Sequence, residues 1–248
     1  MKEAPKTMPE LRPDEDLSVL FDFGFAQSKT GYRFGIDALL LAYHITNGPA
    51  KCLTPECKMM EIGTGSGVVS ILSVAWGFLG KITAIELQEQ LADRAKRNVQ
   101  AASMGSQITV ITADATTMAD DQTRYDRIIS NPPFYPKGQG RPNPNSEKML
   151  SRHESTLTMR SLFALASQRL TPTGILSVLY PYKRLEEARS QATKTNLKIQ
   201  GITPCSHNEA QPPTILILDL VQAHNQTTNE TWHPQTSMNR ASFPKLNQ

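Results

Sequence analysis

The sequence predicts an α/β fold in which a mostly parallel sheet carries helices on both faces. Short apolar segments alternate with segments of helical spacing from residue 59 onward, which is the pattern of strand–helix–strand units. A glycine-rich turn follows the first of these apolar segments and leads into a helix. A polar side chain stands directly after several of the expected strands, at the edge where doubly wound sheets bind ligands. With 248 residues, the chain is long enough for one large domain of this kind.

The expected elements follow one another along the chain. A short strand at 21–25 and a helix from Asp37 come first. We then expect strands at 59–62, 81–85, 107–113, 124–129, 174–180, 198–203 and 214–221, and helices at 68–77, 88–103, 159–170 and 183–196. We expect 1–20 to be a flexible lead-in, 21–222 to be the folded domain, and the polar segment 223–248 to be poorly ordered.

Composition and charge narrow the class of protein. The charged, proline-containing start of the chain is no secretory signal, and no apolar run is long enough to span a bilayer. Cys52, Cys57 and Cys205 have neither even pairing nor metal-ligand spacing, which indicates a reducing, cytoplasmic setting and no metal site. The net charge of +3 permits nucleic-acid binding without requiring it.

The glycine-rich turn reads Glu61-Ile-Gly-Thr-Gly-Ser-Gly67. Its glycines, among them Gly63 and Gly65, allow a sharp turn and a close approach of the backbone to a ligand. Glu86 ends the next strand, 19 residues after Gly67, where a carboxylate of a βαβ unit meets ribose hydroxyls. The glycine spacing differs from the Gly-x-Gly-x-x-Gly of dinucleotide-binding proteins, and no Gly-Lys-Ser/Thr ends the run as in a Walker A loop.

A second motif, Asn131-Pro-Pro-Phe-Tyr135, stands at the carboxyl end of the strand expected at 124–129. The two prolines hold the chain extended and leave carbonyl groups without partners in a helix or a ladder. Asn131 adds a carboxamide that both donates and accepts, and Phe134 and Tyr135 add flat apolar faces. Such a set suits a planar group bearing an NH2, such as a base or an amide. The alternative is an ordinary loop with two prolines.

Two further features border this predicted site. Asp114 directly follows the strand expected at 107–113, where it serves as a helix N-cap, as a ligand-binding acid, or as both. Basic residues gather between residues 137 and 160, after the Asn-Pro-Pro motif. They favour nucleic acid over a peptide as the substrate, and the alternative is a solvated loop.

The glycine turn and the Asn-Pro-Pro-aromatic motif resemble those of class I S-adenosylmethionine-dependent methyltransferases. Adenine N6-methyltransferases of DNA and RNA, ribosomal guanine N2-methyltransferases and release-factor glutamine methyltransferases share the second motif. The glutamine enzymes carry a sizeable helical domain before the first motif, whereas only about sixty residues precede it here. The segments Gly31-Tyr-Arg-Phe-Gly-Ile-Asp-Ala-Leu-Leu-Leu-Ala42 and Ser151-Arg-His-Glu154 are similar to those of the bacterial tRNA1(Val) adenine N6-methyltransferase group.

The resemblance implies a Rossmann-like seven-stranded sheet whose last strand is antiparallel. It implies S-adenosyl-L-methionine as the cofactor, structured RNA and above all tRNA as the partner, and neither a membrane nor a metal. The implied reaction is methyl transfer to the exocyclic amine of adenine; a guanine amine of rRNA, a protein glutamine and a catalytically inactive RNA-binding module are the alternatives. The segment 33–37 is implied to close over cofactor or substrate. The implied residues are Asn131, Pro132, Pro133 and Phe134 for catalysis; Glu61, Gly63, Gly65, Gly67, Glu86, Asp114 and Asn131 for the cofactor; and Tyr135, Lys137 and Arg152 for the substrate.

Overall fold

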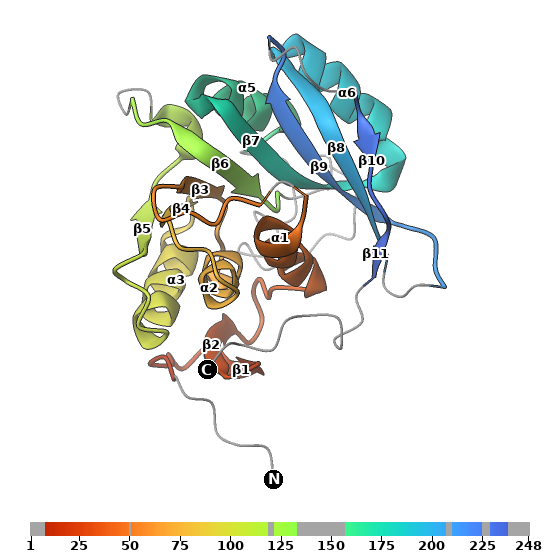
Figure 1. Cartoon of the computed structure of the whole chain (residues 1–248). Coiled ribbons are helices and arrows are strands. Elements are labelled where there is room, and N and C mark those ends of the chain that lie inside the picture. Colours follow the sequence, from red (N-terminus) through yellow and green to blue (C-terminus); the bar gives the residue numbers. More distant parts are fainter. Residues whose placement is uncertain are drawn as a thin grey trace.

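The computed structural model of the chain describes residues 8–49, 51–118, 122–132, 157–206, 210–224 and 229–237. A central sheet carries helices on both of its faces (Figure 1). Three helices cover one face and two cover the other: α1 (Ile36–Asn47), α2 (Val68–Ala75) and α3 (Glu89–Ala101) against α5 (Met159–Arg169) and α6 (Leu185–Lys194). The α/β fold expected from the sequence is confirmed.

Seven strands form the body of the sheet, in the order β5-β4-β3-β6-β7-β9-β8. Strand β9 runs antiparallel to both of its neighbours, and the other pairs are parallel. The expected seven-stranded sheet with an antiparallel last strand is therefore confirmed. The bounds are β3 (Lys58–Ile62), β4 (Lys81–Glu86), β5 (Ile108–Thr112), β6 (Tyr125–Ser130), β7 (Leu170–Pro181), β8 (Leu197–Ser206) and β9 (Ile215–Gln222).

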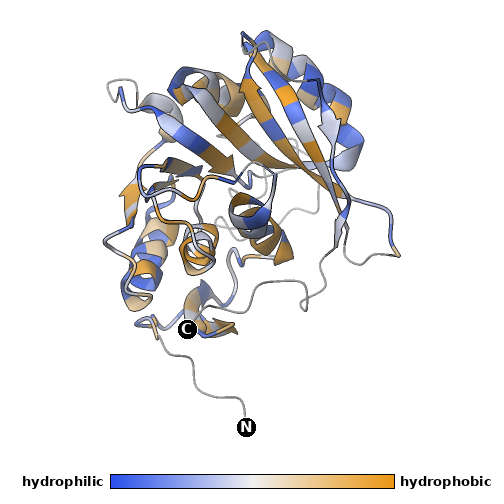
Figure 2. Cartoon of the chain, viewed as in Figure 1, coloured by the Kyte–Doolittle hydropathy of each residue, from blue (hydrophilic) through white to orange (hydrophobic). Residues whose placement is uncertain are grey.

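Both faces of the sheet are buried along β3, β4, β6 and β9, which is why it contains long apolar runs such as that of β9. Neighbouring residues of a strand point to opposite faces. Met59 and Ile129 belong to the hydrophobic cluster of α1 and α2, and Met60 and Ile128 belong to that of α5 and α6. Figure 2 shows the hydrophobic residues along β7 and β9. Within the described residues, no helix is both long enough and apolar enough to cross a bilayer.

The topology brings the polar strand ends to one edge of the sheet. Because β3, β4, β5 and β6 are parallel, their carboxyl ends lie side by side. Ile62 of β3 is level with Ser130 of β6, and the Ser130 hydroxyl donates to the Ile62 carbonyl over 2.8 Å. Glu86 ends β4, Asp114 follows β5, and Asn131 follows β6. Residues far apart in the sequence therefore border one space.

Part of the expected N-terminal lead-in is ordered instead. Strands β1 (Glu15–Leu20) and β2 (Phe23–Ser28) form an antiparallel hairpin beside α3. The buried Glu15 carboxylate accepts hydrogen bonds from Arg94 (2.8 Å) and Arg97 (2.6 Å). Burial by itself raises the pKa of Glu15, but the hydrogen bonds from Arg97, a backbone N–H and Arg94 outweigh it and lower the pKa to about 2. The expectation of a flexible lead-in is wrong for β1, because its anchors lie 79 and 82 residues further along the chain.

Part of the C-terminal segment that we expected to be poorly ordered is also ordered. Strands β10 (Thr231–Trp232) and β11 (Thr236–Ser237) pair in parallel with β8. The backbone N–H of His233 between them donates to the Ile202 carbonyl over 2.8 Å. The expectation is therefore wrong for residues 229–237. An edge strand offers backbone donors and acceptors, and a polar segment can pair with them without any apolar pattern of its own.

Candidate active site

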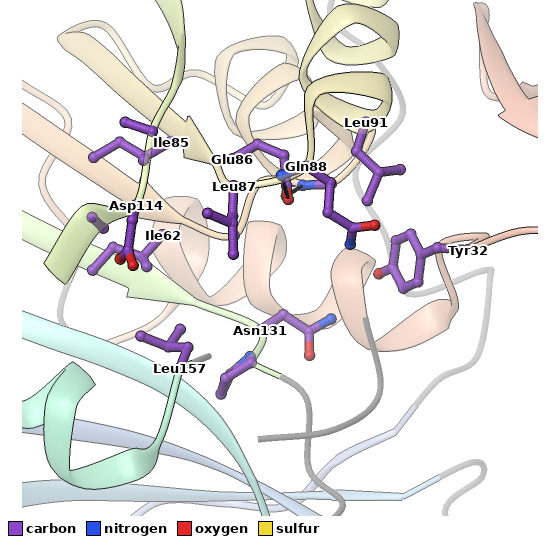
Figure 3. A pocket seen from close by; sticks show the side chains of 15 residues that line it. Tyr32, Ile62, Ile85, Glu86, Leu87, Gln88, Leu91, Asp114, Asn131 and Leu157 are labelled. Carbon is purple, nitrogen blue, oxygen red and sulfur yellow. Dashed lines mark hydrogen bonds between the residues drawn. The ribbon is translucent and has the colours of Figure 1, made fainter. Parts of the chain in front are cut away.

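A cavity of about 780 Å³, measured with its open mouth, lies at the carboxyl edge of the sheet (Figure 3). Its walls come from the ends of β3, β4, β5 and β6 and from the segments that precede α1 and α5. Six residues that the sequence singled out line it: Gly63, Gly65, Glu86, Asp114, Asn131 and Pro132.

The glycine turn forms the floor of the cavity because its backbone adopts conformations that other residues avoid. Gly63, Gly65 and Gly67 have φ angles of +74°, +59° and +82°. The backbone N–H groups of Gly63 and Thr64 both donate to the Ile85 carbonyl, over 2.9 and 3.0 Å. The turn is thereby held against the end of β4. Gly67 directly precedes α2 and does not line the cavity. It faces α3 instead, because a Cβ on Gly67 would contact Ala95 of that helix at 3.4 Å.

Glu61 supports the glycine turn from behind rather than facing the cavity. Its buried carboxylate accepts hydrogen bonds from the hydroxyls of Thr64 (2.8 Å) and Ser70. Burial raises the pKa of Glu61 to about 7, the two hydroxyl bonds work in the opposite direction, and the Glu86 carboxylate adds to the rise. Glu61 therefore links the end of β3 to both the turn and the first part of α2.

Glu86 is fixed by two backbone donors. One oxygen accepts from the N–H of Gly65 (2.8 Å), and the other accepts from the N–H of Gln88 (2.9 Å). The side chain is buried against the protein but lies on the wall of the cavity (Figure 3). A carboxylate offers about four acceptor positions. It can therefore hold two backbone donors and the two hydroxyls of a ribose together.

Asp114 caps a short helix and also lines the cavity. One carboxylate oxygen accepts from the backbone N–H and the hydroxyl of Thr116, over 2.9 and 2.6 Å, and so caps the short helix η1 (Ala115–Thr117). The residue also lines the cavity, on the wall next to Ala113 and Ala115. Capping does not remove it from the ligand's reach.

Asn131 and Pro132 lie at the end of β6, opposite Glu86 across the cavity (Figure 3). The Asn131 carboxamide is half-buried and points into the open space. The other residues expected for catalysis and for the substrate lie outside the described residues: Pro133, Phe134, Tyr135, Lys137 and Arg152.

Tyr32 was not predicted to be a site residue, although it directly precedes the segment 33–37 that was expected to close over the site. The Tyr32 ring lines the cavity and lies 3.1 Å from the position of a Cβ on Gly65. Burial raises the pKa of Tyr32, and nearby carboxylates, Glu86 first, add to the rise, so the hydroxyl is neutral. Arg33 anchors this segment to the hairpin through Asp16 (2.6 Å).

Apolar wall residues were also missed. Leu87 is 42% exposed and lines the cavity next to Glu86, and Leu91 and Leu157 add further apolar surface. Such side chains suit the flat face of a base. The sequence signal that could have predicted Leu87 as a wall residue is its position directly after Glu86, the acid that ends β4. Among the residues that the structure describes, no group of His, Cys, Asp or Glu side chains is arranged to hold a metal ion.

The fold is the Rossmann-like α/β fold found in methyltransferases of known structure. Solved structures share the fold: Methanocaldococcus jannaschii Trm5 in complex with adenosine has a TM-score of 0.60 at 14% identity and covers 86% of this chain and 56% of its own. A predicted O-methyltransferase from Agrobacterium tumefaciens has a TM-score of 0.58 at 17% identity and covers 85% of this chain and 91% of its own.

The chain belongs to the methyltransferase small domain family, which matches residues 38–192. It is 30% identical over 198 residues to the tRNA1(Val) (adenine(37)-N6)-methyltransferase of Salmonella arizonae, covering 79% of this chain and 78% of that protein. A protein of the same name from Porphyromonas gingivalis is 28% identical over 185 residues, covering 73% of this chain and 71% of its own. The resemblance stated from the motifs is confirmed, and the protein is a methyltransferase.

Proposed function

We propose that this enzyme uses S-adenosyl-L-methionine to methylate the exocyclic amine of adenine in RNA, namely N6 of an adenosine in tRNA. The observation that carries the proposal is a single cavity in which Gly63, Gly65, Glu86 and Asp114 face Asn131 and Pro132. The names of the relatives from Salmonella arizonae and Porphyromonas gingivalis support the same substrate. A tRNA substrate would place the enzyme in the cytoplasm.

The cavity fits the cofactor by its shape and its polar groups. A Cβ on Gly63 would meet no atom of the described residues within 4 Å, apart from its chain neighbours, so these residues leave open space beside its backbone. This space suits the methionine part, Glu86 suits the ribose diol, and Asp114 suits the amine of the adenine ring. Leu87 offers the adenine an apolar face. When bound, the cofactor supplies an electrophilic methyl group on a positively charged sulfur.

Asn131 and Pro132 would hold the amine that receives the methyl group. The lone pair of an aromatic amine is delocalised into the ring, so the amine is a poor nucleophile. Two acceptors, the Asn131 carboxamide oxygen and the Pro132 carbonyl, can take its two N–H bonds and favour a pyramidal nitrogen. They also place negative potential beside the amine nitrogen, which becomes positively charged as its bond to the methyl carbon forms. The amine proton then leaves to water, so positioning is the main task of these residues.

Labelled cofactor identifies the acceptor directly. The protein is incubated separately with total tRNA, ribosomal RNA, DNA and a release factor, and the labelled product is digested. We expect label in tRNA that is recovered as N6-methyladenosine. Label in a guanine of ribosomal RNA or in a protein glutamine would replace the proposal, and absence of label everywhere would point to an inactive module.

Two variants test the assigned roles. Asn131→Ala is expected to lower the turnover at least about 100-fold, as the loss of a transition-state hydrogen bond does, while the cofactor affinity stays within about twofold. Asn229→Ala, in the C-terminal segment, is the matched control.

Glu86→Ala is expected to weaken cofactor binding about 10- to 100-fold, because a hydrogen bond to a charged group contributes about 1.5–3 kcal/mol. The exposed Glu89→Ala is its control. Unchanged turnover or unchanged affinity, respectively, would remove the residue from the site.

A further inference from the structure

A second polar and aromatic surface lies on the turn that follows β7, at the carboxyl edge of the sheet that also carries the cavity. This turn is the short helix η2 (Tyr182–Arg184), which leads into α6. Strand β7 is the parallel neighbour of β6, and Val178 of β7 is level with Ser130 of β6. Tyr182 therefore follows β7 at the edge where Asn131 follows β6.

The register places the turn at the distance of one nucleotide from the acceptor site. The pairing of β6 with β7 ends at Ser130 and Val178, so Asn131 lies one residue beyond the last pair and Tyr182 lies four residues beyond it. A strand rises about 3.3 Å per residue and neighbouring strands lie about 4.8 Å apart, so extended backbone would separate the Cα atoms of Asn131 and Tyr182 by roughly 11 Å. A nucleotide adjacent to a base held by Asn131 would reach this turn.

The turn is rigid, yet it presents its aromatic ring to solvent. The Tyr182 backbone N–H donates to the Thr214 carbonyl (3.0 Å), which ties the turn to the start of β9. Arg184 stacks over the Tyr180 ring at 5.0 Å and pairs with Glu187 at 2.8 Å. Tyr182 itself is 40% exposed. An aromatic ring held outward on a fixed backbone is a platform for a base.

The charge beside this ring is positive. Lys183 is exposed, and within the described part of the chain it takes part in no ion pair. The acidic residues of the first turn of α6 are engaged by arginines rather than by Lys183: Glu187 pairs with Arg184, and Glu186 shares Arg189 with Glu230. The surface thus combines a stacking ring with a cation, which is the combination that binds a base and its phosphate.

We propose that Tyr182 and Lys183 bind the nucleotide next to the methylated adenosine, with the Tyr182 ring stacked on its base and the Lys183 ammonium on its phosphate. This inference rests on the proposed function and adds a substrate contact to it. An adenosine that leaves its stack to enter the cavity loses its neighbour. The Tyr182 ring would stack on the base of the neighbouring nucleotide and so replace the contact with the adenosine. Lys183 would hold the phosphate of that nucleotide while the adenosine rotates into the cavity.

The test compares variants of the full chain with labelled total tRNA as the ligand and as the methyl acceptor. Tyr182→Ala is expected to weaken tRNA binding and to raise the KM for tRNA about 5- to 100-fold, the effect of losing one stacked base, and Tyr182→Phe is expected to stay within about twofold of the wild type. Lys183→Ala is expected to reduce the slope of log affinity against log salt by about 0.7 to 0.9. The exposed Lys194, at the other end of α6, is the matched control, and Lys194→Ala should leave the slope unchanged.

The outcomes separate this inference from the proposed function. Cofactor affinity should equal that of the wild type in all four variants, which shows that they are folded. If the wild type methylates tRNA but Tyr182→Ala and Lys183→Ala bind and methylate it equally well, the inference is wrong and the proposed function stands. If the wild type neither binds nor methylates tRNA, both are overturned.

Discussion

The contact between Tyr32 and the glycine turn can be tested by adding single methyl groups to the turn. Gly63 and Gly65 both have positive φ angles, +74° and +59°, so alanine at either position is strained by about 1–2 kcal/mol. Their surroundings differ. Among the residues that the structure describes, a Cβ on Gly63 meets no atom within 4 Å, whereas a Cβ on Gly65 would lie 3.1 Å from Tyr32 Cε1 and 3.7 Å from its Cδ1. The ring must then move by a few tenths of an ångström.

These distances set the expected magnitudes. Gly63→Ala should lower the free energy of unfolding of the cofactor-free protein by about 1–2 kcal/mol, from backbone strain alone. Gly65→Ala should lower it by about 1 kcal/mol more, the lower end of the range for overpacking, because the ring stands at a cavity and has room to shift. In the double variant Tyr32→Ala/Gly65→Ala this extra loss should disappear. Tyr32→Ala/Gly63→Ala should instead be additive within about 0.5 kcal/mol.

Urea unfolding of the single and double variants gives the two cycles, and calorimetric titration of the cofactor gives the functional consequence. We expect Gly65→Ala to weaken cofactor binding and Tyr32→Ala to weaken it further, since the ring forms part of the cavity wall. If the two alanine variants are equally stable and neither cycle shows coupling, the Tyr32 ring does not lie against Gly65, and its placement in the site is wrong.

The remaining predictions concern pH. The pKa of Glu15 is about 2, against an ordinary value of 4.5. Its contribution of about 3 kcal/mol to the free energy of unfolding is therefore present above pH 4.5 and is lost as the pH falls toward 2. Glu15→Gln should lower the free energy of unfolding by about that amount at pH 7 and by much less at pH 3. The pKa of Glu61 is raised to about 7, so stability should fall as the pH rises from 4.5 to 7, and Glu61→Gln should abolish this fall. Urea unfolding across the pH range measures both, and parallel pH profiles of wild type and variant would contradict either assignment.

Much of the architecture and half of the site could be predicted from local patterns. The strands β3 to β9 are apolar runs bounded by polar turns, and the glycine spacing, Glu86 and Asn131 stand at strand ends. Parallel strands necessarily share one carboxyl edge, so chain position alone was enough to bring these residues together. The cofactor roles proposed for Gly63, Gly65, Glu86 and Asp114 depend on that rule and on their place around the cavity.

Other features were decided only by contacts between distant segments. The residues of β1 are mixed in polarity, and this pattern predicts a flexible lead-in. The strand is ordered because Glu15 is stabilised by arginines that lie 79 and 82 residues further along the chain. Pairing of β10 and β11 with the edge strand β8 uses backbone groups, which every sequence carries. Tyr32 gives no local sign of facing Gly65, because the two residues belong to segments that lie far apart in the sequence and meet only in the folded chain.

The division has one physical cause. Hydrophobic periodicity and turn chemistry act within a few residues, so the sequence by itself determined the order of strands and helices, the glycine turn and the polar residues at the strand ends. Burial of a charge, the pairing of an edge strand and the shape of a cavity depend on partners far along the chain. Only the tertiary structure therefore decided that Glu61 supports the turn from behind, that Tyr32 lines the cavity, and that Tyr182 stands exposed on the turn after β7.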